Sequence, residues 1–177
     1  MNFTQLINGI EICDNAFDEK IINTFYSKIK NNCFHFWGKS EPNDEPSFWK
    51  LPLFVEEKNW TNSDFVEEIN YFSKSLNKKF NRIYVNGQTF GQSGSFHTDG
   101  DSATTYLLYP DFFWDIKRGG GTEFKILNND TTVVVYPKFN RLIRFNATIK
   151  HRSLPNIDPK GLRVSVAFKT QEENNSD

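Results

Sequence analysis

The stretch Leu162-Arg163-Val164-Ser165-Val166-Ala167-Phe168 alternates between large apolar residues and polar or small ones. A period of two is typical of a β-strand, and it predicts that the large apolar side chains share one face while Arg163, Ser165 and Ala167 share the other. An arginine buried on such a face without a partner costs several kcal/mol. We therefore expect the inner face of this strand to hold an anion, and a carboxylate ligand would satisfy Arg163.

Upstream of this strand, the motif His97-Thr98-Asp99 and a distant His151 supply two imidazoles and one carboxylate. This donor set is the facial triad of non-haem Fe(II) oxygenases, which leaves metal positions open for other ligands. His97 and Asp99 are two residues apart, so on an extended strand both side chains leave the same face. His151 must then come from another strand. We interpret the third histidine, His35, as a non-ligand.

Taken together, His97-x-Asp99, His151 and Arg163-x-Ser165 resemble the signature of the Fe(II)/2-oxoglutarate-dependent dioxygenase superfamily, in its prolyl 4-hydroxylase-like branch. The resemblance extends between these motifs, to the segments 108–111, 114–115, 119–124 and 136–142. It implies that His97, Asp99 and His151 bind Fe(II) and form the catalytic centre. It also implies a reaction in which 2-oxoglutarate and O2 become succinate and CO2 while an unactivated C–H bond is hydroxylated, with ascorbate as a reductant in assays.

The same resemblance assigns residues to the co-substrate. Arg163 is the expected partner of the distal carboxylate of 2-oxoglutarate, because its planar fork binds a carboxylate through two hydrogen bonds and stays charged. Ser165 would donate to the same group. Tyr109 either supplies a further hydrogen bond or is a tyrosine of the core, and the sequence leaves both readings open.

The substrate is less defined than the co-substrate, because Pro110 and the pair Gly121-Thr122 depart from the family pattern. A prolyl residue in a protein or peptide is the leading interpretation, and a free amino acid or another small metabolite is the alternative. The residues proposed for substrate contact are Trp37, Trp49, Trp114 and Arg152.

Two further alternatives stay open. Segment 112–121 is either a glycine-hinged aromatic lid near the site or a bulged hairpin whose aromatic side chains are tucked in. The whole chain is either an oxygenase or a metal-binding jelly-roll protein without oxidative activity. Arg163 favours the oxygenase, because a simple metal-binding module needs no buried partner for a carboxylate.

The pattern along the chain predicts a mainly β fold, a double-stranded β-helix or jelly roll, buttressed by two N-terminal α-helices. Asp14 is expected to cap the first helix, segment 31–59 to form a loop, and the motif at 61–64 to open the second helix. We expect one dioxygenase domain over 1–171, with helical support at 14–80 and a jelly-roll core at 82–169, followed by a disordered tail at 172–177. The predicted strands of the core are 82–86, 95–99, 103–109, 122–127, 131–136, 141–145, 150–153 and 162–169.

The charge and cysteine content of the chain bear on its expected partners and location. The 21 basic and 22 acidic residues give a net charge of −1, so no basic field attracts phosphates and a nucleic-acid partner is disfavoured. The two cysteines, Cys13 and Cys33, are too few for a disulfide framework and fit a reducing cytosol. The sequence shows neither a secretory signal nor a membrane span, so we expect a cytoplasmic protein without a membrane partner. It leaves the oligomeric state open.

Overall fold

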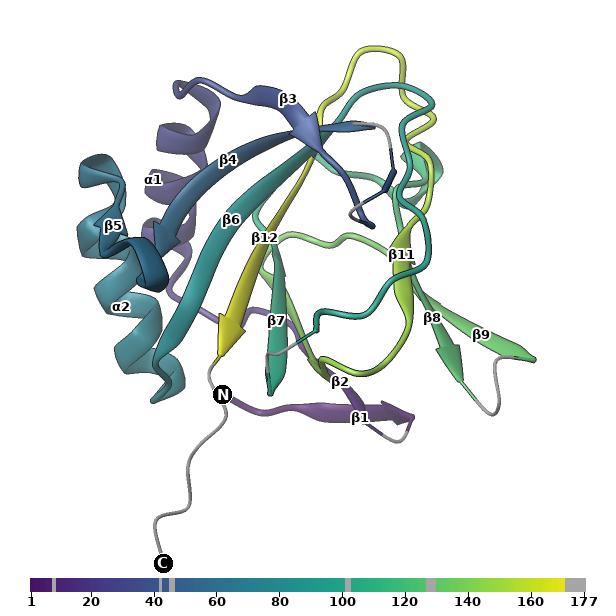
Figure 1. Cartoon of the computed structure of the whole chain (residues 1–177), viewed down its shortest axis with the longest axis horizontal. Coiled ribbons are helices and arrows are strands. Elements are labelled where there is room, and N and C mark those ends of the chain that lie inside the picture. Colours follow the sequence, from purple (N-terminus) through teal and green to yellow (C-terminus); the bar gives the residue numbers. More distant parts are fainter. Residues whose placement is uncertain (8, 42, 45–46, 101–102, 127–129, 171–177) are drawn as a thin grey trace, which may run out of the picture.

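The computed structural model describes the chain except for residues 8, 42, 45–46, 101–102, 127–129 and 171–177. Two antiparallel β-sheets face each other, and two α-helices lie on the outer side of the larger sheet (Figure 1). The expected mainly β fold is therefore confirmed, in a jelly-roll-like form. The tail predicted at 172–177 lies outside the described residues. Within the described part of the chain, no helix is both long and apolar enough to cross a bilayer.

The larger sheet has nine strands and carries most of the chain. At its centre, β12 pairs antiparallel with β7 on one side and with β6 on the other. The strand β5 (Trp60–Thr61) pairs with β4 beside the main path. In spatial order, the main path is β1 (Thr4–Ile7), β2 (Ile10–Cys13), β10 (Arg141–Asn146), β7 (Thr104–Tyr109), β12 (Arg163–Thr170), β6 (Phe80–Gln88), β4 (Phe48–Val55) and β3 (His35–Gly38).

The smaller sheet has three strands, in the order β11 (His151–Ser153), β8 (Thr122–Ile126) and β9 (Thr131–Val135). An apolar cluster joins its inner face to that of the larger sheet. In this cluster the rings of Phe124 and Phe145 meet edge to face, with centroids 4.9 Å apart. The buried members of the cluster are Ile10, Tyr84, Leu107, Tyr109, Phe124, Val135, Ile143, Phe145 and Ala167.

The helices α1 (Glu19–Lys30) and α2 (Val66–Leu76) cover the outer face of the larger sheet. Phenylalanine rings join the three elements: the centroid of Phe72 lies 5.0 Å from that of Phe25 and 5.1 Å from that of Phe168. Three short 3-10 turns complete the structure, at η1 (Glu56–Lys58), η2 (Ser63–Phe65) and η3 (Ile116–Arg118). The apolar side of each helix therefore packs on the sheet.

Strand β12 confirms the alternation from which its two faces were predicted. Val164, Val166 and Phe168 belong to the core beneath the helices, whereas Ala167 belongs to the cluster between the sheets. Arg163 shares the inner face with Ala167, because alternate residues of a strand point to the same side. The inner face of the larger sheet therefore meets the smaller sheet with polar residues as well as apolar ones.

The placement of the helices differs from the expected N-terminal pair. Strands β1 and β2 precede α1, and strands β3, β4 and β5 separate α1 from α2. The predicted cap was also wrong: the carboxylate of Asp18 accepts the N–H of Ile21 at 3.1 Å and caps α1. Asp14 instead binds Arg141. Both Asp14 and Asp18 precede the helix and could cap it by their residue type. Only the ion pair of Asp14 with Arg141, which the local sequence does not show, tells the two apart.

Two strand assignments also need correction. Segment 31–59, expected as a loop, contains β3 and the long strand β4. Pro52 of β4 lies where the register of β4 against β6 shifts, so the strand tolerates the missing N–H. Segment 95–99, expected as a strand, forms only an isolated bridge between His97 and His151. The motif at 61–64 does open a helical segment: the side-chain oxygen of Asn62 accepts the N–H of Asp64 and caps η2, which leads directly into α2 at Val66.

Candidate metal and co-substrate site

His97, Asp99 and His151 meet in space as the sequence predicts. One ligand atom from each lies within 4.8 Å of the other two. Nε2 of His97 lies 3.7 Å from Oδ1 of Asp99, and Nε2 of His151 lies 3.6 Å from Oδ2. Two imidazole nitrogens and a carboxylate oxygen at this separation can bind one ion between them, and the donor set suits Fe(II).

The main chain fixes the distance between the two histidines. The N–H of His97 donates to the carbonyl of His151 at 3.0 Å, and the N–H of His151 donates to the carbonyl of His97 at 2.9 Å. Asp99 is held in the same way, because its N–H donates to the carbonyl of Ala147 at 2.9 Å. The three ligand residues are therefore positioned by backbone hydrogen bonds, without a regular strand at 95–99.

Hydrogen bonds also set the tautomer of each imidazole. Nδ1 of His97 lies 3.0 Å from the carbonyl of Ser95, and Nδ1 of His151 lies 2.9 Å from the carbonyl of Ile149. A carbonyl only accepts, so each Nδ1 carries the proton and each Nε2 presents its lone pair to the ion. Burial lowers the pKa of His151 to about 4, which keeps its imidazole neutral and able to ligate.

Two residues that the sequence analysis did not identify hold the carboxylate of Asp99. The hydroxyl of Thr105 donates to Oδ2 at 2.5 Å, and the ammonium of Lys169 contacts the same oxygen. Burial alone would raise the pKa of Asp99, but Lys169 and His151 outweigh it and lower the pKa to about 2. Asp99 is therefore ionised and oriented. The alternation of β12, continued by two residues past Ala167, would have placed Lys169 on the inner face.

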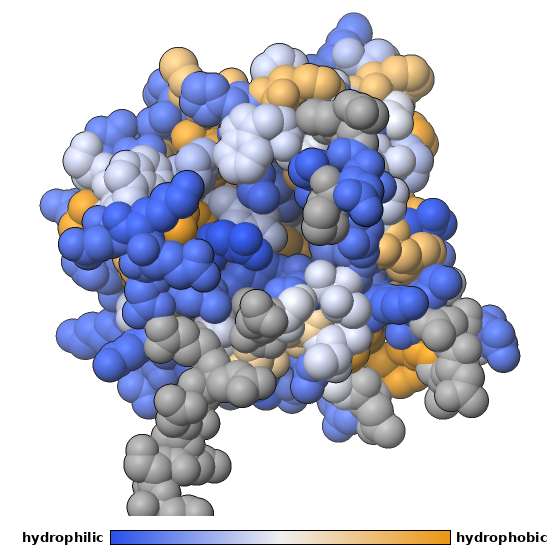
Figure 2. Space-filling view, in the orientation of Figure 1, coloured by the Kyte–Doolittle hydropathy of each residue, from blue (hydrophilic) through white to orange (hydrophobic). Residues whose placement is uncertain are grey.

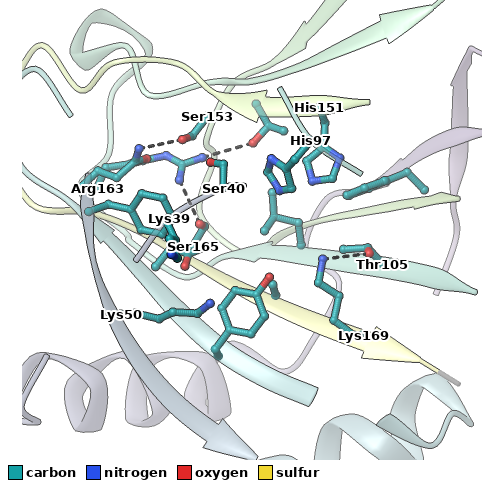
Figure 3. A pocket seen from close by; sticks show the side chains of 18 residues that line it. Lys39, Ser40, Lys50, His97, Thr105, His151, Ser153, Arg163, Ser165 and Lys169 are labelled. Carbon is teal, nitrogen blue, oxygen red and sulfur yellow. Dashed lines mark hydrogen bonds between the residues drawn. The ribbon is translucent and has the colours of Figure 1, made fainter. Parts of the chain in front are cut away.

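Arg163 is buried, with 2 % of its surface exposed, and its guanidinium contacts only neutral groups (Figure 3). Nε donates to the carbonyl of Gly120 at 2.7 Å, and Nη1 donates to the hydroxyl of Ser165 at 3.0 Å. Nη2 donates to the hydroxyls of Thr122 at 3.2 Å and Tyr109 at 3.4 Å. Among the residues that the structure describes, no carboxylate pairs with Arg163.

One cavity contains both the arginine and the imidazoles. Arg163 and Ser165 line it together with His97 and His151, and Figure 3 shows these side chains pointing into a common space. Two further side chains of this cavity have buried oxygens with no hydrogen-bond partner among the described residues, and they belong to Asn86 and Gln88. A buried guanidinium without a counter-ion fits one carboxylate of a dicarboxylate ligand that also reaches the metal position, whereas the two amide oxygens are left for hydrogen-bond donors.

A glycine makes room for the arginine. Gly120 has a φ of +68°, and a Cβ there would lie 3.1 Å from both Cγ of Arg163 and Cζ2 of Trp114. Trp114, a predicted substrate residue, is buried behind this glycine, and its Nε1 donates to the carbonyl of Gly119 at 3.2 Å. Trp114 and the aliphatic part of Arg163 thus both lie against Gly120.

The other residues proposed for substrate contact are spread over three places. Trp37 is exposed on β3, with its ring 5.2 Å from Nζ of Lys50. The ring of Trp49 packs on Phe36, with centroids 5.1 Å apart. Arg152 donates to the carboxylate of Glu123 at 2.7 Å. Their contact with a substrate stays a prediction. His35 is exposed on β3 and is not part of the triad, in line with its interpretation as a non-ligand.

Comparison with known proteins identifies the fold. No family model matches the sequence, and no curated protein matches it. Solved structures do match over nearly the whole chain. A prolyl hydroxylase from Trichoplax adhaerens, in complex with a hypoxia-inducible-factor peptide, has a TM-score of 0.72 and 17 % identity, covering 93 % of this chain and 84 % of its own.

Two further structures widen the comparison. An oxidoreductase of the 2OG-Fe(II) oxygenase family from Burkholderia pseudomallei has a TM-score of 0.73 and 13 % identity, over 94 % of this chain and 86 % of that one. HygX from Streptomyces hygroscopicus, with nickel, 2-oxoglutarate and hygromycin B bound, has a TM-score of 0.63 and 11 % identity, over 93 % and 83 %. The resemblance expected from the motifs is thus confirmed at the level of the fold.

Proposed function

We propose that this chain is an Fe(II)- and 2-oxoglutarate-dependent dioxygenase that hydroxylates an unactivated C–H bond. The observation that carries the proposal is the buried guanidinium of Arg163, which has only neutral partners in the described part of the chain and shares a cavity with the metal-type triad. Burying such a cation without a counter-ion is costly, so the working protein needs an anion there. The shared fold of the solved 2-oxoglutarate oxygenases supports the same conclusion.

Each group of residues has a separate task in this proposal. His97, Asp99 and His151 would hold Fe(II), which supplies the oxygen chemistry that turns 2-oxoglutarate and O2 into succinate, CO2 and an oxidant for the substrate. Asp99 stays ionised because Lys169 and Thr105 hold it.

Arg163 would bind the distal carboxylate of 2-oxoglutarate. Its Nη1 and Nη2 already donate to hydroxyls of Ser165, Thr122 and Tyr109, and a hydroxyl can turn its own proton toward a carboxylate. The hydroxyls of Tyr109 and Thr122 lie 2.6 Å apart, so one of them donates to the other and a proton remains for the ligand. We therefore assign both hydroxyls, with Ser165, to the co-substrate.

For the substrate we propose a prolyl residue in a protein or peptide first, and a free amino acid or other small metabolite second. The structural neighbours include a prolyl hydroxylase in complex with a peptide and HygX with hygromycin B bound, so the fold serves both kinds. We also propose that residues 1–171 act as one domain, since β1 and β2 extend the same sheet that contains β12.

Succinate formation tests the activity. Purified protein is incubated in air with Fe(II), ascorbate and 2-oxoglutarate, with and without proline-containing peptides and free amino acids. We expect succinate in the wild type and none above background in His97→Ala, because the metal loses a ligand. His35→Ala is the matched control, since this exposed histidine lies outside the triad, and it should keep the wild-type rate.

A negative result separates the alternatives. If Mn(II) binds in calorimetry but neither 2-oxoglutarate binding nor succinate is detected with any additive, the proposal is wrong. The chain would then be a metal-binding jelly-roll protein without oxidative activity.

A further inference from the structure

A second cavity lies beside the metal-type triad, over the paired strands β4 and β6. We call it the β4–β6 groove. It shares Lys50 and Tyr84 with the cavity that contains Arg163, and the metal-type ligand Asp99 lines it as well. Figure 2 shows mainly hydrophilic residues over this part of the face. The groove therefore gives a substrate access to the metal position. Its further lining residues include Trp37, Lys58 and Arg82.

Three cationic side chains surround one aromatic ring at the inner end of this groove. Nζ of Lys50 lies 4.0 Å from the ring centroid of Tyr84, Cζ of Arg82 lies 5.3 Å from it, and Nζ of Lys169 lies 5.8 Å from it. Lys169 has Asp99 as its partner. Neither Lys50 nor Arg82 makes an ion pair with any residue that the structure describes. Lys50 is partly buried and its ammonium contacts the rings of Tyr84 and Trp37, whereas Arg82 is exposed and its guanidinium is also hydrated.

The charges of the loaded site do not balance without another anion. Fe(II) is a dication and 2-oxoglutarate is a dianion, so together they add no net charge. The cations Arg163, Lys169, Lys50 and Arg82 then face the carboxylate of Asp99, and among the described residues that line the groove only the exposed Glu57 adds to the acidic side. An excess of positive charge remains, and it lies on the groove side of the metal position, at Lys50 and Arg82.

We propose that the substrate is a carboxylic acid whose carboxylate binds Lys50 and Arg82 while its apolar part packs on Trp37. This inference rests on the proposed dioxygenase activity and names the substrate class for the same site. The fork of Arg82 fits a carboxylate, and Lys50 adds a point charge from the opposite strand. Burial lowers the pKa of Lys50 to about 8, a value at which most of its ammonium is still charged at neutral pH.

The carboxylate could belong to a free amino acid or to a peptide, and matched acid and amide pairs distinguish these sources. Binding is measured by calorimetry to protein loaded with Mn(II) and 2-oxoglutarate, which takes up ligands without turnover. The probes are L-proline and L-leucine against their carboxamides, and a proline-containing peptide with a free against an amidated C-terminus and with Glu against Gln beside the proline. We expect at least one acid to bind on the order of tenfold or more tightly than its amide.

Substitutions then locate the preference. Lys50→Met and Arg82→Met should each abolish most of the difference between acid and amide, and Lys50→Arg should retain it because the charge is kept. Lys20→Met is the control, since Lys20 is an exposed lysine of α1, and it should leave the difference unchanged. Melting temperatures of all variants show that they fold.

The results separate this inference from the proposed function. If no acid binds more tightly than its amide, or if the preference persists in Lys50→Met, the inference is overturned even when 2-oxoglutarate binds normally. If 2-oxoglutarate fails to bind the Mn(II)-loaded wild type, the proposed function and this inference both fall. A preference for free amino acids identifies a small-molecule substrate, and a preference among the peptides identifies a peptide.

Discussion

The two faces of strand β12 are equally buried and yet opposite in chemistry. Every residue from Arg163 to Thr170 is buried. On the outer face, Val164, Val166 and Phe168 pack against the helices and their core. On the inner face, Arg163 and Lys169 place two positive charges near the two ends of the same strand. Burial therefore says nothing by itself about the role of a residue, and what lies opposite each face has to be considered.

The outer face of β12 contributes mainly to stability, and the inner face is expected to contribute mainly to ligand binding. Burial of the apolar side chains on the outer face lowers the free energy of the folded state, which stabilises the fold. Charged side chains on the inner face lose their hydration, and only charged or hydrogen-bonding partners offset that free-energy cost. They therefore lower the stability of the fold unless a ligand completes the site. Substitutions on the outer face should thus lower the free energy of unfolding, whereas those on the inner face should mainly lower ligand affinity.

The largest expected effect is on the outer face. Phe168→Ala removes a ring that contacts Phe72 and Phe80, and it should lower the free energy of unfolding by about 3–5 kcal/mol in urea denaturation. Phe113→Ala is the control, because this ring is 71 % exposed and its loss should change stability by less than about 0.5 kcal/mol. Equal destabilisation by both changes would mean that the outer face is not the main source of stability.

The next effect concerns the inner face of the same strand. Arg163→Met should weaken 2-oxoglutarate binding by about 2–5 kcal/mol in calorimetry, the cost of leaving a buried carboxylate without its charged partner. Stability should stay the same or rise, since a buried charge is removed. Arg144→Met, a surface arginine paired with Glu11, should leave the affinity unchanged. Unaltered 2-oxoglutarate affinity in Arg163→Met would contradict the co-substrate assignment.

A smaller effect is expected at the other end of this face. Lys169→Met frees Oδ2 of Asp99 from its ammonium partner and should weaken Mn(II) binding about 10–100-fold, as loss of a group that orients a ligand usually does. Thr105→Val, which removes the second contact of that oxygen, should act in the same direction. Tighter metal binding in Lys169→Met would show that the lysine competes with the metal rather than orienting its ligand.

The smallest effect lies at the surface, away from both faces. Hydrogen bonds from Arg141, with help from Lys138, outweigh burial and lower the pKa of Asp14 from 3.8 to about 2. The folded state therefore gains stability from this carboxylate above pH 3.8, and it loses that gain as the pH falls through about 2. Because the pair is open to solvent, Asp14→Asn should cost only about 1 kcal/mol at pH 7.

Urea denaturation at several pH values tests this last prediction. The difference between wild type and Asp14→Asn should shrink as the pH falls below 3.8 and vanish below about 2. Asp130→Asn is the matched control, because Asp130 is exposed and should give no difference at any of these pH values. A difference that does not change with pH would mean that the ion pair is not its source.

Local pattern was enough to predict the metal-type triad and the arginine. His97, Asp99 and Arg163 stand in short motifs whose residue types have few other uses together, and β12 keeps a strict alternation. The same alternation carried to Lys169 would have predicted a second inner-face cation. The expected inner face ended at Ala167, so it did not include Lys169, the partner of Asp99.

Other parts of the site depend on contacts between distant segments, which no local pattern records. Lys50 lies in a stretch rich in loop-forming residues, and its strand β4 exists because it pairs with β6. Asp14 and Asp18 look alike to a capping rule, but only Asp14 meets Arg141 across the fold. Thr122 gains its role only because β8 brings its hydroxyl to the guanidinium of Arg163.

In the bridge between His97 and His151, the spacing of the two positions depends on the backbone, whereas the chemistry depends on the side chains. Both of its hydrogen bonds join main-chain atoms, so any residues other than proline can stand at these two positions without losing the bridge. The spacing of the two ligand positions is then a property of the backbone and is inherited by every variant. A protein engineer can exchange the ligands, for a different metal or for none, and keep the scaffold that holds them.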